Sequence, residues 1–149
     1  ADSAWATVDY KWLRAVPRGK FTGVHTDLVY FGDKAPSLCT FWIPFGDICM
    51  EQGTLMVATE YHKREAFAEL WRTYGTSRVG RDGAWSGWLS DNAQDLQKVA
   101  DGGWVSADMR MGDVVLLPLT TMHMSAANTT DRLRISADTR WHLRSESLG

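Results

Sequence analysis

Short runs of alternating apolar and polar residues recur along this chain. Runs rich in β-branched and aromatic residues, closed by turn signals such as Pro17-Arg18-Gly19, predict short β-strands. The expected strands cover residues 8–16, 22–31, 37–45, 53–59, 104–107, 113–117, 121–125 and 132–141. From about residue 64 to 74 apolar positions instead fall at helical spacing, and a weaker helical pattern follows residue 90. This order predicts a mainly β jelly roll with one or two short helices inserted after the fourth strand, because a βαβ fold needs a helix between most strands.

The last expected strand has two faces of opposite character. Its polar face carries Arg132, Arg134, Ser136, Asp138 and Arg140. Apolar residues alternate with these from Leu133 to Trp141, and a bare apolar sheet face is a liability. If the polar face lines a site, something must cover the apolar one. We therefore expect a partner chain or a missing N-terminal segment to cover the sheet.

Composition and charge exclude several classes of partner. The 149 residues fit a single domain, residues 1–149, and a net charge of -2 gives no reason to expect nucleic acid or an anionic membrane. No apolar run approaches the ~20 residues that span a bilayer, and no signal peptide is present, so we expect a cytoplasmic protein. Cys39 and Cys49 lack a metal-binding spacing and are expected to be unpaired thiols.

Histidines and a carboxylate suggest a metal site. In a strand, His25 and Asp27 would point to the same face. The other histidines are His62, His123 and His142, of which His123 lies in a late strand that a jelly roll can bring beside an early one. Two imidazoles and a carboxylate suit Fe(II), although other divalent ions can occupy such a set.

An arginine follows His123 at a spacing that suits a dicarboxylic cosubstrate. Arg134 lies eleven positions downstream, and its guanidinium can pair with a carboxylate through two hydrogen bonds. Ser125 shares a strand face with His123 and can add a hydroxyl donor. Arg132 is the competing candidate for the arginine. Each of these residue types is also common as a packed or solvated residue of a strand.

Several motifs resemble the phytanoyl-CoA dioxygenase family of Fe(II)- and 2-oxoglutarate-dependent oxygenases. They are Gly23-Val24-His25-Thr26-Asp27, Phe41-Trp42-Ile43-Pro44, Gly53-Thr54-Leu55-Met56-Val57, Gly112-Asp113-Val114-Val115, and His123-Met124-Ser125 followed by Asn128 and Arg134. The resemblance implies a double-stranded β-helix, Fe(II) as the metal and 2-oxoglutarate as the cosubstrate. It implies that the iron ligands are His25, Asp27 and His123. It also implies that the distal carboxylate of 2-oxoglutarate binds Arg134 and Ser125, and that Trp42 lines its pocket.

The resemblance further implies an activity, the hydroxylation of an unactivated C–H bond of a small organic or acyl substrate. The reaction would consume O2 and release succinate and CO2. The presence of Asp27, rather than a small residue that leaves room for a halide, favours hydroxylation over halogenation. Two features depart from the family: Thr59-Glu60-Tyr61-His62 replaces a Gly-Ser-His segment, and the N-terminal helical region is absent.

Two other classes of function stay open on the sequence. One is a catalytically idle jelly-roll domain that binds a metal or small ligand, or that serves as an assembly module. The other is a cupin-like enzyme that uses the metal without a 2-oxo acid. The polar stretch 76–88, with Arg78, Arg81, Trp85 and Trp88, is a candidate lid over the site.

Overall fold

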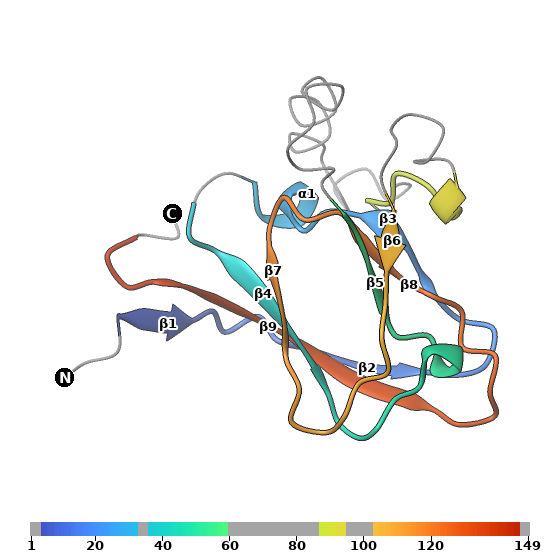
Figure 1. Cartoon of the computed structure of the whole chain (residues 1–149). Helices are drawn as coiled ribbons and strands as arrows, with labels where there is room; N and C mark the ends of the chain where they lie inside the picture. Colours follow the sequence, from blue (N-terminus) through green and yellow to red (C-terminus); the bar gives the residue numbers. More distant parts are fainter. Residues whose placement is uncertain (1–3, 33–35, 60–86, 95–102, 147–149) are drawn as a thin grey trace.

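Two antiparallel sheets form the framework in the computed structural model, which describes residues 4–32, 36–59, 87–94 and 103–146 (Figure 1). The first sheet contains β1 (Trp5–Thr7), β2 (Trp12–Val16), β4 (Cys39–Pro44), β7 (Val115–Pro118) and β9 (Arg134–Leu143). The second contains β3 (Thr22–His25), β5 (Leu55–Ala58), β6 (Trp104–Val105) and β8 (His123–Ser125). Within the described residues, α1 (Leu28–Phe31) and the 3-10 helix η1 (Met50–Gln52) lie between strands.

Early and late strands alternate within each sheet. The ten-residue β9 pairs with β4 along one edge and with β1 and β2 along the other, and β4 also pairs with β7. In the second sheet the order is β3-β8-β5-β6. This interleaving confirms the predicted double-stranded β-helix. The helix expected over residues 64–74 lies outside the described residues.

The polar face of β9 points into the protein. Arg134, Ser136, Asp138 and Arg140 are buried, whereas Leu133 is 57% exposed. The apolar core is divided into separate clusters, one around Val24 and Met122 and one in which Trp42 and Leu117 of the first sheet pack with Leu55 of the second. Buried charged groups need partners, so this polar interior is a candidate ligand-binding site. A covering segment or partner chain for the outer face stays a prediction.

The expected strand over residues 22–31 is wrong beyond His25. The chain instead turns into α1, where the backbone N–H groups of Tyr30 and Phe31 donate to the carbonyl of Asp27. The run Leu-Val-Tyr-Phe packs as a helix, with Val29 buried. A short apolar run of this kind does not distinguish strand from helix by its periodicity. Asp27 therefore lies at the start of a helix, not on a strand face.

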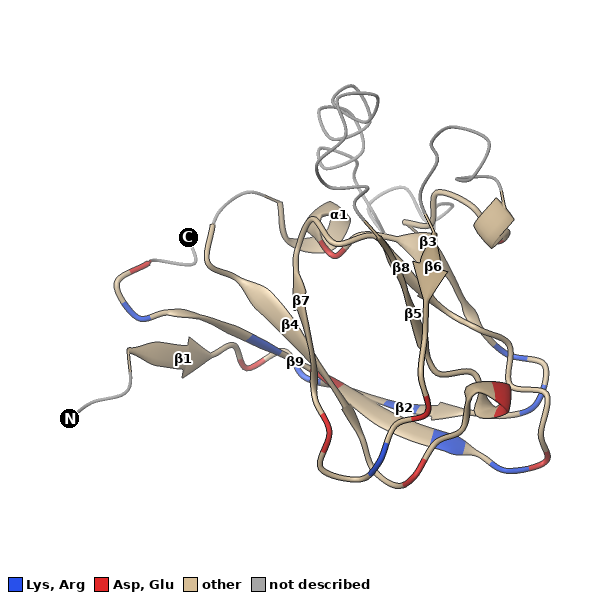
Figure 2. Cartoon of the chain, in the orientation of Figure 1, with Lys and Arg blue, Asp and Glu red and all other residues tan. Residues whose placement is uncertain are grey.

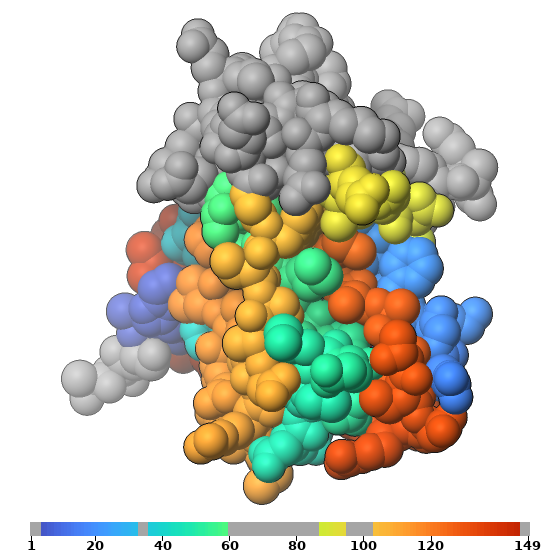
Figure 3. Space-filling view, turned by 45° about the vertical axis from the view of Figure 1, so that its right-hand side comes forward, coloured from blue at the N-terminus to red at the C-terminus, as the bar shows by residue number. Residues whose placement is uncertain are grey.

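The segment 87–94 packs against the beginning of the second sheet. Val24 and Ser90 form a β-bridge, and the N–H groups of Val24 and Leu89 each donate across it at 2.7 Å. The space-filling view shows this segment, in yellow, next to the blue N-terminal part of the chain (Figure 3). This contact brings Trp88 to the same end of the fold as His25.

The cysteines, the described helices and the distribution of charge can be compared with the sequence predictions. Both cysteines are free thiols, as expected. Among the described helices, none has the length and apolar character needed to cross a lipid bilayer. Acidic and basic residues of the described chain are interspersed on its loops, while β2 and β9 carry charge within the sheet (Figure 2).

Candidate metal centre

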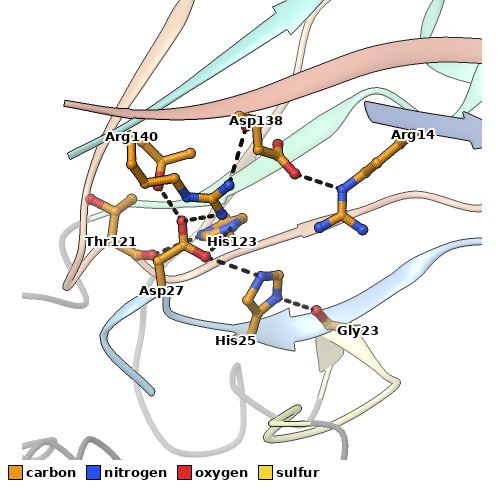
Figure 4. A network of polar contacts seen from close by, with 9 residues as sticks. Arg14, Gly23, His25, Asp27, Thr121, His123, Asp138 and Arg140 are labelled. Atoms are coloured by element: carbon orange, nitrogen blue, oxygen red, sulfur yellow. Dashed lines mark hydrogen bonds and ion pairs between the residues drawn. The ribbon is translucent and has the colours of Figure 1, made fainter. Parts of the chain in front are cut away.

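Three residues from separate elements converge in the interior. His25 ends β3, Asp27 precedes α1, and His123 begins β8, where it is the register partner of His25. Their ligand atoms all lie within 4.8 Å of one another. Oδ1 of Asp27 is 3.7 Å from Nε2 of His25 and 4.0 Å from Nε2 of His123 (Figure 4). The structure thus brings together the three residues that the sequence proposed as ligands.

Backbone carbonyls orient both imidazoles. Nδ1 of His25 lies 2.8 Å from the carbonyl oxygen of Gly23, and Nδ1 of His123 lies 3.0 Å from that of Thr121. With Nδ1–H donated to a carbonyl, each Nε2 keeps its lone pair toward Asp27. Burial, aided by the nearby His123, lowers the pKa of His25 to about 3, so this ring is neutral at neutral pH. A neutral imidazole is the form that binds a metal ion.

The two oxygens of Asp27 have different surroundings. Oδ1 faces the imidazoles, while Oδ2 accepts hydrogen bonds from the Thr40 hydroxyl and, at 3.4 Å, from Nη2 of Arg140. Burial by itself raises the pKa of Asp27, but His123, Arg140 and His25 together with the Thr40 hydrogen bond outweigh it and lower the pKa. The carboxylate is therefore ionised, with one oxygen left for a metal.

A chain of charged residues backs this carboxylate. Arg140 also donates from Nη1 to the Asp138 carbonyl at 3.3 Å, and Nε of Arg14 donates to Oδ2 of Asp138 at 2.6 Å (Figure 4). Sequence reasoning placed Asp138 and Arg140 on the polar face without giving them a role, and it missed Thr40 and Arg14. Thr40 and Trp42 are two residues apart on β4, so strand alternation could have predicted that Thr40 faces the interior as Trp42 does.

Arg134 lies in the same interior with part of its guanidinium unpaired. Its side chain is 1% exposed, and Nε and Nη1 have no hydrogen-bond partner among the described residues. The guanidinium carbon lies 5.8 Å from the centre of the Trp42 ring. Burial, with a smaller effect from Arg14, lowers the pKa of Arg134 to about 10, so it stays charged at neutral pH. A buried cation with unpaired donors is an expensive arrangement that an anionic ligand would relieve.

One cavity joins the six residues proposed from the sequence. It is lined by His25, Asp27, His123, Ser125, Trp42 and Arg134. The Ser125 hydroxyl oxygen accepts a 2.8 Å hydrogen bond from the N–H of Thr22, so its own proton is free to face the cavity. The competing Arg132 is exposed.

The other sequence candidates lie elsewhere. His142 belongs to the far end of β9 and is not part of the cluster of potential ligands. His62 and most of the candidate lid, including Arg78, Arg81 and Trp85, fall outside the described residues. Trp88 is described and lies close to the metal centre, in a neighbouring cavity.

The donor set and the cavity fit Fe(II) with a dicarboxylic cosubstrate. Two imidazole nitrogens and one carboxylate oxygen on the same side of a cavity match the ligand set of non-haem Fe(II) oxygenases, which leaves positions open. The unpaired nitrogens of Arg134 fit a carboxylate in the same cavity. A β-helix with this site defines a class, the mononuclear-iron proteins with two histidines and one carboxylate.

Comparison with known proteins gives the family. The model of the phytanoyl-CoA dioxygenase family (PhyH) matches residues 7–136, and the chain belongs to this family. The match confirms the sequence resemblance. A sequence comparison with curated proteins gives no match.

Solved structures share the fold at low sequence identity. The α-ketoglutarate-dependent epimerase SnoN from nogalamycin biosynthesis has a TM-score of 0.62 at 18% identity, with 91% of this chain and 46% of that chain covered. The carbocyclase SnoK from the same biosynthesis has 0.62 at 22%, covering 93% and 50%. EctD from S. alaskensis, solved with 2-oxoglutarate and 5-hydroxyectoine, has 0.64 at 17%, covering 93% and 45%. The chain thus spans about half the length of these structures.

Proposed function

We propose that the chain carries the catalytic centre of an Fe(II)- and 2-oxoglutarate-dependent oxygenase. The observation that carries this proposal is the buried Arg134, whose unpaired nitrogens share one cavity with the ligand atoms of His25, Asp27 and His123. A metal site alone would not need this arginine. Family membership supports the proposal, as do the related structures of SnoN in complex with Fe3+ and α-ketoglutarate and of EctD with 2-oxoglutarate.

Each residue has a role in holding the reactants. Nε2 of His25, Nε2 of His123 and Oδ1 of Asp27 would hold Fe(II). The distal carboxylate of 2-oxoglutarate would bind Arg134 and the Ser125 hydroxyl, with Trp42 as a wall of the pocket. When bound, iron and 2-oxoglutarate supply the oxidising chemistry, which uses O2 and releases succinate and CO2.

The neighbouring side chains keep these ligands in position. Thr40 and Arg140 hold Oδ2 of Asp27, which leaves Oδ1 as the single ligand atom of that carboxylate. Gly23 and Thr121 fix the imidazole orientation through their carbonyls. Such contacts beyond the ligands set metal affinity and ring orientation.

We propose hydroxylation of an unactivated C–H bond as the reaction. Asp27 occupies the ligand position that a halogenating site would leave for a halide. The related structures include an epimerase and a carbocyclase, so the mass of the product distinguishes hydroxylation from these two reactions. The substrate gains one oxygen atom in a hydroxylation and none in an epimerisation or ring closure.

Two measurements test the proposal. Anaerobic addition of Fe(II) and 2-oxoglutarate should produce a weak visible absorption band from the metal-bound 2-oxo acid, and aerobic incubation should release succinate. Asp27→Ala should abolish both. A chain that gives neither band nor succinate would be an idle scaffold, contrary to the proposal.

Arg134 and Arg132 offer a matched pair of variants to test 2-oxoglutarate binding. Arg134→Ala should greatly raise the concentration of 2-oxoglutarate required, because it removes the buried guanidinium. Arg132→Ala removes an exposed arginine and should leave this requirement unchanged. A metal-dependent activity that survives Arg134→Ala unchanged would instead identify a cupin-like enzyme without a 2-oxo acid.

A further inference from the structure

A second cavity opens beside the metal centre and is walled by aromatic rings. Its volume is about 670 Å³, within the usual range for small-molecule pockets. We call it the aromatic recess, after the lining residues Tyr10, Trp12, Phe21, Tyr30, Phe31 and Trp88. The recess also reaches His25 and Asp27, so a molecule inside it would lie next to the metal ligands.

The rings form contacts with one another along the wall. Tyr10 packs edge-on against Trp12 at 6.0 Å and against Phe31 at 6.4 Å between ring centres. Phe21 and Trp88 form a tilted pair at 5.7 Å. Trp88 comes from a segment far from the other four rings in the sequence, so the fold completes the wall with a distant part of the chain.

One ring connects the wall to the metal centre. Tyr30 meets the His25 ring edge-on at 5.9 Å between ring centres. Burial, with the nearby Asp27, raises the pKa of Tyr30 to about 12, so its phenol stays protonated at neutral pH. The aromatic wall therefore continues up to the metal centre.

The side chains that line the recess favour an aromatic ligand over an alkyl chain. Among the described lining residues none is Leu, Ile, Val or Met, the side chains that usually surround an alkyl chain. Tyr10, Trp12, Phe21 and Tyr30 are each more than a third exposed, which is unusual for a group of adjacent aromatic residues. Aromatic faces and edges favour another flat ring through stacking or edge contacts.

The charges around the recess favour an acidic group on the ligand. Arg14 lies at the boundary with the metal cavity, with its guanidinium carbon 4.6 Å from the centre of the Trp12 ring and Nε on Asp138. Its terminal nitrogens point away from Asp138 (Figure 4). The one lining carboxylate among the described residues, Asp27, is held at Oδ2 by Thr40 and Arg140 and would bind the metal through Oδ1. A cationic ligand would therefore meet two arginines and no available carboxylate.

We propose that the aromatic recess binds the primary substrate and that this substrate is a planar aromatic acid. Its rings would lie against the Trp12 side of the wall, and its carboxylate would pair with the terminal nitrogens of Arg14. This placement brings the rings beside His25 and Asp27. The inference rests on the proposed oxygenase function, whose substrate it narrows.

Three probes separate flatness from charge in a calorimetric binding assay on the 149-residue chain. Anthracene-2-carboxylate is flat and anionic, 2-(hydroxymethyl)anthracene is flat and neutral, and dodecanoate is anionic but flexible. We expect the flat acid to bind about 5–150-fold more tightly than either of the others, since one stacking or ion-pair contact contributes about 1–3 kcal/mol. Equal or tighter binding of dodecanoate would overturn the proposal.

Two tryptophans on consecutive strands of the chain provide a matched pair of variants. Trp12 and Trp5 have similar exposure and both lie on strands that pair with β9, but Trp12 alone of the two lines the recess. Trp12→Ala should weaken anthracene-2-carboxylate binding by about tenfold or more, and Trp5→Ala should leave it unchanged. Equal effects of the two changes would contradict the assignment of the recess.

Arg14→Gln tests the acidic group in the same assay. It should weaken the binding of the flat acid while the binding of the flat alcohol stays the same. An equal loss for both ligands would show that Arg14 has only a structural role and would overturn the ion pair.

A final measurement separates this inference from the proposed function. The visible band formed with Fe(II) and 2-oxoglutarate should shift when anthracene-2-carboxylate is added, because the acid would lie beside the metal. A normal band with no shift and no acid binding would overturn the inference and leave the oxygenase proposal in place. Acid binding without any band would overturn the oxygenase proposal.

Discussion

Replacing Arg134 with methionine should stabilise the chain in the absence of cosubstrate. The guanidinium is 1% exposed and two of its nitrogens lack partners among the described residues. A methionine side chain is also long and unbranched, so it can occupy much of the same space without an unpaired donor. The change would therefore remove a desolvation cost from the folded state.

The size of the effect follows from these unpaired groups. Each buried donor without a partner costs about 1–3 kcal/mol, and two such donors are present. The contact between Arg134 and the Trp42 ring is lost, which offsets about 0.5–2 kcal/mol of the gain. The central values, about 4 kcal/mol for the two donors less about 1 kcal/mol for the ring contact, leave a net gain of about 3 kcal/mol, which corresponds to a rise in Tm of roughly 6–12 °C for a domain of this length.

The same substitution should remove cosubstrate binding. Two charge-assisted hydrogen bonds contribute about 1.5–3 kcal/mol each, so the dissociation constant of 2-oxoglutarate should rise by about two to four orders of magnitude. Calorimetric unfolding with and without 2-oxoglutarate, in the presence of Co(II), measures both effects. Arg132→Met is the control and should change neither. If Arg134→Met has a Tm several degrees below that of the unsubstituted chain without 2-oxoglutarate, the reasoning is refuted. It is also refuted if 2-oxoglutarate raises the Tm of Arg134→Met as much as it raises that of the unsubstituted chain.

Three further predictions concern the hydrogen bond to Asp27, the glycines with positive φ and the pH dependence of stability. Thr40→Val should weaken Co(II) binding by about 10–100-fold in calorimetric titration, because it removes a hydrogen bond to Asp27, the proposed ligand carboxylate, whereas Thr40→Ser should retain affinity. Gly53→Ala should destabilise the fold by more than about 2 kcal/mol in urea unfolding, since φ is +79° and the new Cβ would lie 2.3 Å from a backbone oxygen. Gly19→Ala, at φ +77° in open space, should cost only about 1 kcal/mol. Without metal, the chain should lose stability as pH falls from about 6.5 toward 3, because His25 takes up its proton more readily when unfolded; His25→Asn should reduce this slope in acid unfolding.

The sequence was sufficient to predict the fold class and many of the residues that line the cavity. Period-two alternation identified the polar face of the last strand, and its burial in the structure agrees with that expectation. The small number of histidines narrowed the choice of potential ligands, and the motif resemblance favoured Arg134 where spacing had left Arg132 as a competing candidate. Both inferences depend on local pattern, which a single sequence displays.

The surroundings of Asp27 could not be predicted in this way. Thr40 reaches its carboxylate because β4 pairs with β9 in a register that places Thr40 opposite Arg140. Such a register is set by contacts between distant segments and is not visible in either strand alone. The change from strand to helix after His25 was likewise hidden, because four apolar residues fit both structures.

The position of His25 and His123 on neighbouring strands has a consequence for folding. Their strands, β3 and β8, are joined by a short pairing with an irregular register, yet they close a loop of nearly a hundred residues. A metal ion held by both histidines would act as a cross-link between the two halves of the chain. Metal binding would then favour assembly of the fold as well as chemistry, and substitutions that loosen this strand pair would lower metal affinity from a distance.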